Sequence, residues 1–172
     1  ATAAAGRLLK LNEQQMVWAL GIAATHACGV RETFGSMAKP LHPGIAARNG
    51  LTAALMAKKN VVGPEQGIDG RRGFAQVAST KIDAAAITEG LGKTWAIAEN
   101  SYKPYACGVV IHPAIDGCVQ LRNEHKLKLA DIAKIDLKVH PLVVELCSRR
   151  DPKSGLEGKF SIEEAIACWQ NG

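Results

Sequence analysis

The chain has 172 residues, of which 47% are hydrophobic and 22% charged, and its formal net charge is +5. This composition predicts a soluble globular protein with a core of its own, in one domain or two small ones, and no apolar run approaches the roughly 20 residues of a membrane span. Aromatic residues make up only 5% of the chain and the basic pairs are scattered, which argues against a nucleic-acid-binding domain.

The first predicted elements are two helices. Residues 1–10 are alanine-rich and are typical of the end of a helix. Asn12 and Gln15 have the spacing of a capping box, so a second helix should begin there and run to about residue 28. His26 falls on this second helix, and we interpret it as a structural residue.

The segment AKPLHPG, residues 38–44, opens the apolar run 45–56 and predicts the start of a central helix. Proline is well tolerated in the first helical turn, and the residue before it is disfavoured in the helical conformation, which marks Lys39 as the entry. Lys39 and His42 should therefore lie beside free backbone N–H groups, where an anion is stabilised. The pair suits a carboxylate and a proton transfer, although an ordinary helix start with a solvated lysine and a core histidine fits the pattern too.

A second segment, KPYACGVVIHPAIDG, residues 103–117, repeats the order of lysine before proline and histidine before proline. An apolar helical pattern follows, so His112 should also lie at the start of a helix. Together, Lys39 and Lys103 with His42 and His112 would form a positively charged cleft for a substrate with several carboxylates.

The remaining pattern divides the chain near residue 90. Residues 74–77 and 82–87 predict short helices, which makes residues 1–90 all-helical. Residues 95–98 suggest a short strand, and 134–140 alternate polar and apolar side chains as a half-buried strand does. His140 after it is expected to be exposed or to cap the next element. Since Ser161 and Glu164 form a further capping box, residues 91–172 predict a small α+β domain.

Five cysteines, an odd number without a CxxC pair, argue against a disulfide framework or a zinc site and for a reducing compartment. That compartment would be the cytoplasm or, in a eukaryote, the mitochondrial matrix. Cys107 lies five residues before His112, so we considered a thiol nucleophile. A free cysteine more often behaves as a small hydrophobic residue, and we favour that interpretation.

Three ordered segments, GSMAKPLHPGIAARNGLTAALMAKKNVVGP, KPYACGVVIHPAIDG and SGLEGKFSIEEAIA, resemble the MmgE/PrpD family. The family includes 2-methylcitrate dehydratase, cis-aconitate decarboxylase and iminodisuccinate epimerase, and the resemblance runs from about residue 3 to about residue 167. It implies a large helical domain and a smaller α+β lid with the active site between them, a homodimer, and a longer chain of which these 172 residues are a fragment.

The resemblance also implies a cofactor-independent lyase or isomerase acting on a small di- or tricarboxylate, without a metal. Lys39 and Lys103 match positions that line the family's active site, and we add Tyr105 as a further substrate-binding residue. The motifs are shared by dehydratases, decarboxylases and epimerases and do not choose among them. Further catalytic Asp and His residues of the family have no counterpart here, so we expect little turnover. A non-catalytic binding or oligomerisation module remains the alternative.

Overall fold

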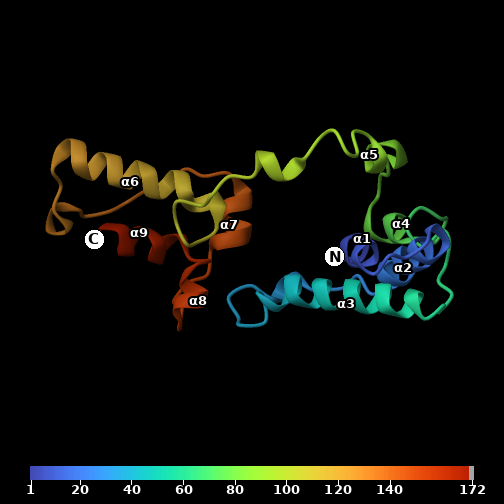
Figure 1. The fold of residues 1–172 in the computed structure, drawn as a ribbon. Helices are drawn as coiled ribbons and strands as arrows, with labels where there is room; N and C mark the ends of the chain where they lie inside the picture. Colours follow the sequence, from blue (N-terminus) through green and yellow to red (C-terminus); the bar gives the residue numbers. More distant parts are fainter. Residues whose placement is uncertain (171–172) are drawn as a thin grey trace. The chain divides into compact units, whose positions relative to one another are not determined.

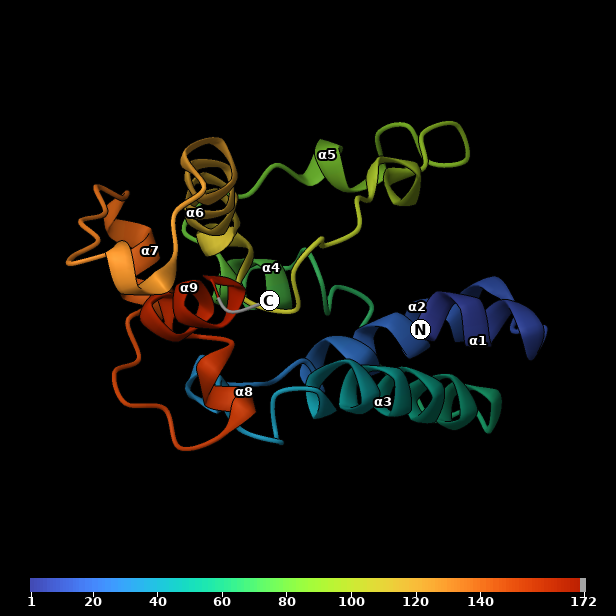
Figure 2. The same ribbon diagram turned by 90° about the vertical axis from the view of Figure 1, so that its left-hand side faces the viewer.

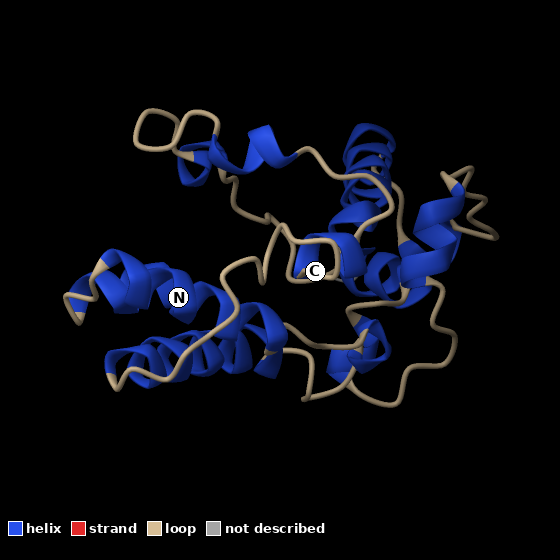
Figure 3. Ribbon diagram, turned by 90° about the vertical axis from the view of Figure 1, so that its right-hand side faces the viewer, coloured by secondary structure: helices blue, strands red, loops and turns tan. Residues whose placement is uncertain are grey.

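The computed structural model describes residues 1–170, and its regular elements are helices joined by loops (Figures 1 and 3). The chain folds into two compact units. Unit 1 comprises residues Ala1–Arg31 and Pro40–Glu99, and unit 2 comprises Glu32–Lys39 and Asn100–Gly172. The segment Glu32–Lys39 therefore packs with unit 2, although its neighbours in the sequence on both sides belong to unit 1.

Unit 1 is built on three helices that lie side by side (Figure 2). In chain order it contains α1 (Thr2–Leu8), α2 (Glu13–Thr25), α3 (Leu41–Lys58), α4 (Phe74–Ala78), α5 (Ala84–Thr88) and the 3₁₀ helix η2 (Ala96–Glu99). The sequence predicted the helices α1 to α5 in this order from caps, prolines and apolar spacing, and these predictions are confirmed, whereas η2 occupies a stretch that was predicted as a strand.

Small side chains allow the helices of unit 1 to approach one another closely. The buried face of α3 consists of Gly50, Ala53, Ala54 and Ala57. A β-carbon on Gly50 would lie 2.6 Å from the β-carbon of Ala1, so nothing larger than hydrogen fits there. Helices packed this closely gain dispersion energy from many short contacts, which offsets the lack of large apolar side chains at this interface.

Local signals in the sequence set where the helices of unit 1 begin. The side chain of Asn12 accepts a hydrogen bond from the backbone N–H of Gln15 at 2.8 Å, and the side chain of Gln15 accepts one from the N–H of Asn12 at 3.2 Å. This is the predicted capping box. Helix α3 begins at Leu41 with Pro40 as its N-cap, directly after Lys39, as the proline pattern predicts.

Unit 2 has its core between α6 and the C-terminal helices. Its elements are η3 (Val109–Ile111), α6 (His112–His125), η4 (Leu129–Asp131), α7 (Pro141–Cys147), α8 (Gly155–Gly158) and α9 (Ile162–Gln170), and η1 (Arg31–Thr33) opens the segment that joins it. The buried cluster consists of Ile111, Ile115, Val143, Cys147 and Ala165. Helices α6 and α9 lie against each other (Figure 1), and they contribute Ile115 and Ala165 to this cluster.

Two side chains cap the helices that close unit 2. The hydroxyl oxygen of Ser161 accepts a hydrogen bond from the N–H of Glu164 at 3.2 Å and so starts α9 where the sequence predicted. Nδ1 of His140 accepts one from the N–H of Leu142 at 3.1 Å at the start of α7. This confirms the capping role expected for His140.

The predicted α+β character of residues 91–172 is wrong. Residues 1–170 contain no strand, and the one β contact described is an isolated antiparallel bridge between Ser148 and Ser161. The stretch 95–98 falls largely in the 3₁₀ helix η2, and residues 134–140 run extended without a hydrogen-bonded ladder. The apolar positions of the predicted alternation were expected to point inward; Ile135 and Leu137 are 42% and 40% exposed, whereas Val139 is half-buried against the core of unit 2. The chain is therefore mainly α.

The length and hydropathy of the helices decide whether any of them could cross a membrane. The longest helix described, α3, has 18 residues and includes arginine, histidine and lysine. In the part of the chain that the structure describes, no helix combines the length and the hydropathy needed to cross a membrane.

A matched pair of glycine substitutions tests the packing of unit 1. In Gly21→Ala the new methyl group would lie 2.0 Å from the carbonyl oxygen of Pro64, so we expect a loss of about 1–3 kcal/mol in the free energy of unfolding. In Gly44→Ala the methyl group meets nothing within 4 Å, and we expect a gain of about 0.4–1 kcal/mol because alanine restricts the unfolded chain. Urea denaturation measures both, and equal effects of the two variants would contradict the packing described.

Candidate functional site

The loop that carries Lys103 is tied to the C-terminal part of unit 2. The ammonium group of Lys103 donates a hydrogen bond to the carbonyl oxygen of Cys107 at 3.3 Å. The next residue, Gly108, donates its backbone N–H to the carbonyl oxygen of Lys159 at 3.0 Å. Lys103 thus lies beside a loop whose position is fixed by a contact with residue 159.

Lys39 reaches the same part of unit 2 from the segment Glu32–Lys39. Its ammonium nitrogen lies 5.7 Å from the centre of the Phe34 ring, within the range of a cation–π contact. The Phe34 ring stacks on Phe160 with ring centres 5.1 Å apart and an angle of 28° between the planes. Lys39 is therefore attached to unit 2 through an aromatic pair.

A second contact anchors this segment. Gly35 adopts a φ of +83°, and a β-carbon there would lie 2.9 Å from a terminal nitrogen of Arg149. The Arg149 guanidinium also pairs with Glu157 at 3.3 Å. Only glycine combines this backbone conformation with so close an approach, so the turn before Lys39 is shaped to fit against Arg149.

Lys39 and Lys103 thus belong to one unit. Each is linked to the pair Lys159–Phe160 indirectly: Lys39 through the Phe34 ring, and Lys103 through the loop of Cys107 and Gly108. The side chains of both lysines are exposed, so they are open to a ligand. The alternative interpretation, that they are solvated lysines, also expects this exposure. Their role in binding stays a prediction.

His112 is the first residue of α6, as predicted from the second motif, and its side chain is buried, with 7% of the residue exposed. The rings of His112 and Tyr105 pack edge to face, with their centres 5.3 Å apart and an angle of 88° between their planes. Nε2 of His112 has no hydrogen-bond partner within the described chain. A buried polar atom without a partner costs free energy, and such atoms often mark a functional site.

The phenol of Tyr105 is fixed at its other end by α6. Its hydroxyl donates a hydrogen bond to a carboxylate oxygen of Asp116 at 2.5 Å. This bond to the neutral phenol is the main reason why the pKa of Tyr105 is raised above its usual value, with partial burial and the negative charges of Asp116 and Cys107 adding to it. Tyr105 therefore stays protonated and able to donate at neutral pH.

Cys107 lies in the same loop and is half-buried. Burial raises the pKa of its thiol, and the nearby ammonium of Lys103 offsets this rise only in part. Since the thiolate is the reactive form, Cys107 is a weak nucleophile at neutral pH, which favours its interpretation as a small hydrophobic residue. Burial, with the nearby Cys107, likewise raises the pKa of the Cys147 thiol in the core.

His42 belongs to unit 1, whereas the other candidate residues belong to unit 2. It is the second residue of α3 and is half-buried, as the motif predicts for a helix start. A β-carbon built on Gly29 would lie 3.5 Å from its ring, so the imidazole packs against the Gly29 turn. Lys39, Lys103, Tyr105 and His112 thus belong to unit 2, where Tyr105 and His112 are in contact, whereas His42 belongs to unit 1.

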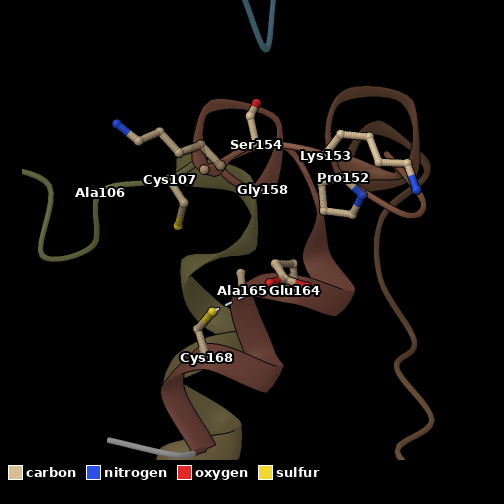
Figure 4. A pocket seen from close by; sticks show the side chains of 11 residues that line it. Ala106, Cys107, Pro152, Lys153, Ser154, Gly158, Glu164, Ala165 and Cys168 are labelled. Carbon is tan, nitrogen blue, oxygen red and sulfur yellow. Dashed lines mark hydrogen bonds between the residues drawn. The ribbon is translucent and has the colours of Figure 1, made fainter.

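A hollow of about 430 Å³ opens in unit 2 between the Cys107 loop, the turn around α8 and the start of α9 (Figure 4). The side chains of Cys107 and Cys168 both point into it, and the Cys168 thiol lies 3.9 Å from a carboxylate oxygen of Glu164. Its size is in the range of small-molecule sites. Lys103 does not line the hollow but contacts Cys107, which does.

The chemistry available in unit 2 comes from ammonium, imidazole and phenol groups. Ammonium groups stabilise the charge of a carboxylate or of an enolate formed beside it, and an imidazole can carry a proton near neutral pH. Within the described residues no three His, Cys, Asp or Glu side chains gather closely enough to hold a metal ion.

Three residues of this arrangement were missed from the sequence. Asp116 could have been found, because it follows His112 by four residues on a predicted helix and so shares its face. Phe34 and Phe160 gave no usable signal, since they are 126 positions apart (160 − 34) and meet only in the folded chain.

Comparison with known domain families gives two matches. The model of the MmgE/PrpD N-terminal domain matches residues 1–86, and that of the MmgE/PrpD C-terminal domain matches residues 105–169. Lys39 and His42 fall in the first match, and Tyr105 and His112 fall in the second.

Three proteins similar to this chain are cis-aconitate decarboxylases or carry a name derived from that activity. A cis-aconitate decarboxylase from Aspergillus terreus is 27% identical over 180 residues, which cover 95% of this chain and 37% of that protein. A cis-aconitate decarboxylase-like protein oryM from Aspergillus oryzae is 30% identical over 76% of the chain and 29% of its own length. The Homo sapiens cis-aconitate decarboxylase is 38% identical over 72 residues, 42% of this chain. The chain thus spans little more than a third of the Aspergillus terreus relative.

A double-mutant cycle tests the anchoring of Lys39. We expect Phe34→Leu and Phe160→Leu to show a coupling of about 0.5–1.5 kcal/mol in the free energy of unfolding, because each removes the same stacked pair. Phe74→Leu, which has no ring partner among the described side chains, gives the cost of this substitution without stacking. Additive effects of the first two variants would contradict the contact.

Proposed function

The chain belongs to the MmgE/PrpD family, and on that premise we propose that it forms the part of a cofactor-independent lyase or isomerase that binds a small di- or tricarboxylate. The observation that carries the proposal is that Lys39 and Lys103, from two separate motifs, both belong to unit 2 and are each linked to Lys159–Phe160 through one intermediate contact. The relatives from Aspergillus and human support the substrate class, since cis-aconitate is a tricarboxylate.

In this proposal the two lysines bind carboxylate groups of the substrate. Loss of carbon dioxide leaves negative charge on the neighbouring carbon, and so does removal of a proton next to a carboxylate, which begins a dehydration or an epimerisation. This charge spreads into a carboxylate as an enolic form, and in a dehydration it is released when the hydroxyl group leaves as water with a proton. Ammonium groups held nearby stabilise that charge more strongly than they stabilise the starting substrate. Lys39 and Lys103 therefore lower the barrier as well as binding the ligand.

His112 is the group that we propose to move the proton. Its Nε2 has no hydrogen-bond partner among the described residues and can donate to a carbanion or accept from a carbon acid. Tyr105, predicted to contact the substrate, lies against the imidazole. His42 remains a second candidate for proton transfer, from unit 1.

Among the three reactions of the family, decarboxylation is favoured by the names of the relatives. The alternative is a binding or oligomerisation module without turnover, either as a homodimer or with another chain. The two differ in one respect: the enzyme converts the tricarboxylate when all its catalytic groups are present, whereas the module only binds it.

Binding of cis-aconitate to the chain tests the role of the lysines. We expect Lys39→Ala and Lys103→Ala each to weaken binding about tenfold to hundredfold, because one charge-assisted contact contributes about 1.5–3 kcal/mol. Lys58→Ala, which removes an exposed lysine at the end of α3, should leave binding unchanged. Isothermal titration calorimetry at two salt concentrations measures this, and equal affinity of all three variants would refute the proposal.

Turnover is a separate prediction. The alignment covers 37% of the Aspergillus terreus relative, and we propose that groups needed for full activity come from the sequence that lies outside this match. The 172-residue chain should therefore bind cis-aconitate and convert little of it. Incubation at high protein concentration with detection of released carbon dioxide measures this. Rapid conversion by the chain alone would show that its own residues suffice.

A further inference from the structure

We propose that Asp116 is a positioning residue of the candidate site: it holds Tyr105 across His112 and so fixes the orientation of the imidazole. The functional meaning of this contact rests on the proposed role of His112 in proton transfer. The contact itself is a property of unit 2 that can be measured without any substrate.

The spacing of the three residues explains how one side chain reaches both others. His112 and Asp116 are one helical turn apart on α6, so their side chains emerge on the same face. Tyr105 approaches this face from the preceding loop, with its ring against His112 and its hydroxyl on Asp116. The phenol therefore spans the first turn of α6 and is attached at both ends.

His112 needs such a support because its own polar contacts are incomplete. No hydrogen bond to Nε2 is found in the described part of the chain, so that end of the imidazole is not held by a polar partner. Ile111 and Ile115, which precede and follow it, are fully buried, and apolar side chains of this kind can confine the imidazole without orienting it by a polar contact. The edge-on contact with Tyr105 does give direction, because the positive edge of one ring prefers the negative face of the other.

The hydrogen bond between Tyr105 and Asp116 depends on the protonation state of the phenol and of the groups around it. The titratable groups that act on Tyr105 are Asp116 and Cys107, with the His112 ring against the phenol and Lys103 behind Cys107. A neutral phenol donates to the Asp116 carboxylate, whereas a phenolate would be repelled by it. A phenol is neutral at neutral pH, and the raised pKa of Tyr105 extends the contact to higher pH; the contact is lost as the pH rises through that raised value.

The experiment begins by isolating the signal of Tyr105. The chain has two tyrosines, Tyr102 and Tyr105, so Tyr102→Phe leaves a single phenol whose ionisation is followed by ultraviolet absorbance. In this background we expect Asp116→Asn to move the titration of Tyr105 to lower pH, because the accepting carboxylate and its charge are gone. Asp116→Glu keeps the carboxylate and should restore the higher value at least in part.

Asp136→Asn is the matched control, since Asp136 is an exposed carboxylate of the same unit that pairs with Lys134 at 2.9 Å. It should leave the Tyr105 titration unchanged. Far-ultraviolet circular dichroism and urea denaturation of every variant establish that it remains folded. If Asp116→Asn unfolds, Asp116→Glu carries the Tyr105 titration, and Tyr105→Phe, which removes only the hydroxyl, carries the measurement on His112.

The second measurement is the imidazole resonances of His112. They should change if Asp116 positions the ring, and should not change if the Tyr105–Asp116 hydrogen bond only stabilises unit 2. The resonances are assigned by nuclear magnetic resonance with His112→Gln. We expect Asp116→Asn and Tyr105→Phe to shift these resonances and Asp136→Asn to leave them in place. An unchanged Tyr105 titration, or unchanged His112 resonances when the titration does move, would overturn the positioning role.

Calorimetry with cis-aconitate separates this inference from the proposed function. If Lys39→Ala and Lys103→Ala do not weaken binding, the proposed function fails, while the titration and the resonances still decide whether Asp116 positions His112. If the lysine variants behave as expected, the two spectroscopic readouts decide the role of Asp116 in the same way. The two failures are therefore distinguishable.

Discussion

The stacked contact between Phe34 and Phe160 is the interaction on which the candidate site depends. Without it, the segment Glu32–Lys39 would have no aromatic anchor in unit 2, and Lys39 would be a lysine on an exposed turn. With it, the first motif contributes an ammonium group to the unit that holds the second motif. Gly35 suits this turn because its φ of +83° is one that residues with a side chain rarely adopt.

The sequence was sufficient where structure is set by neighbouring residues. The capping box at Asn12, the N-cap at Ser161, Pro40 before α3 and Pro113 in the first turn of α6 act within one helical turn. The starts of these helices could therefore be predicted directly from the sequence. The strand predicted at residues 134–140 shows the opposite case. Alternation describes a segment that could be half-buried, but a strand exists only when another strand completes its hydrogen bonds, and residues 1–170 provide none for this segment.

The parts of the site that the sequence predicted are set by neighbouring residues, and the parts that were missed are set by residues remote in the sequence. Lys103 and His112 belong to one continuous motif, and their positions in a loop and at a helix start follow from proline and glycine chemistry. The partners that hold the motif in place are remote in sequence: Lys159 for the loop and Phe160 for the segment of Lys39. No periodicity within either motif carries information about those partners.

The two histidine-before-proline motifs look equivalent in the sequence, yet the positions around them differ in a way that matters. Seven residues before His112 stands Tyr105, and four residues after it stands Asp116; the same offsets from His42 give Gly35 and Ala46. Glycine and alanine cannot cover an imidazole or accept a hydrogen bond from a side chain. The first motif therefore has no counterpart of the Tyr105–Asp116 contact, although both histidines begin a helix. A helix start thus defines where a histidine lies, whereas the residues at these offsets determine whether a hydrogen-bonded tyrosine can pack against its ring.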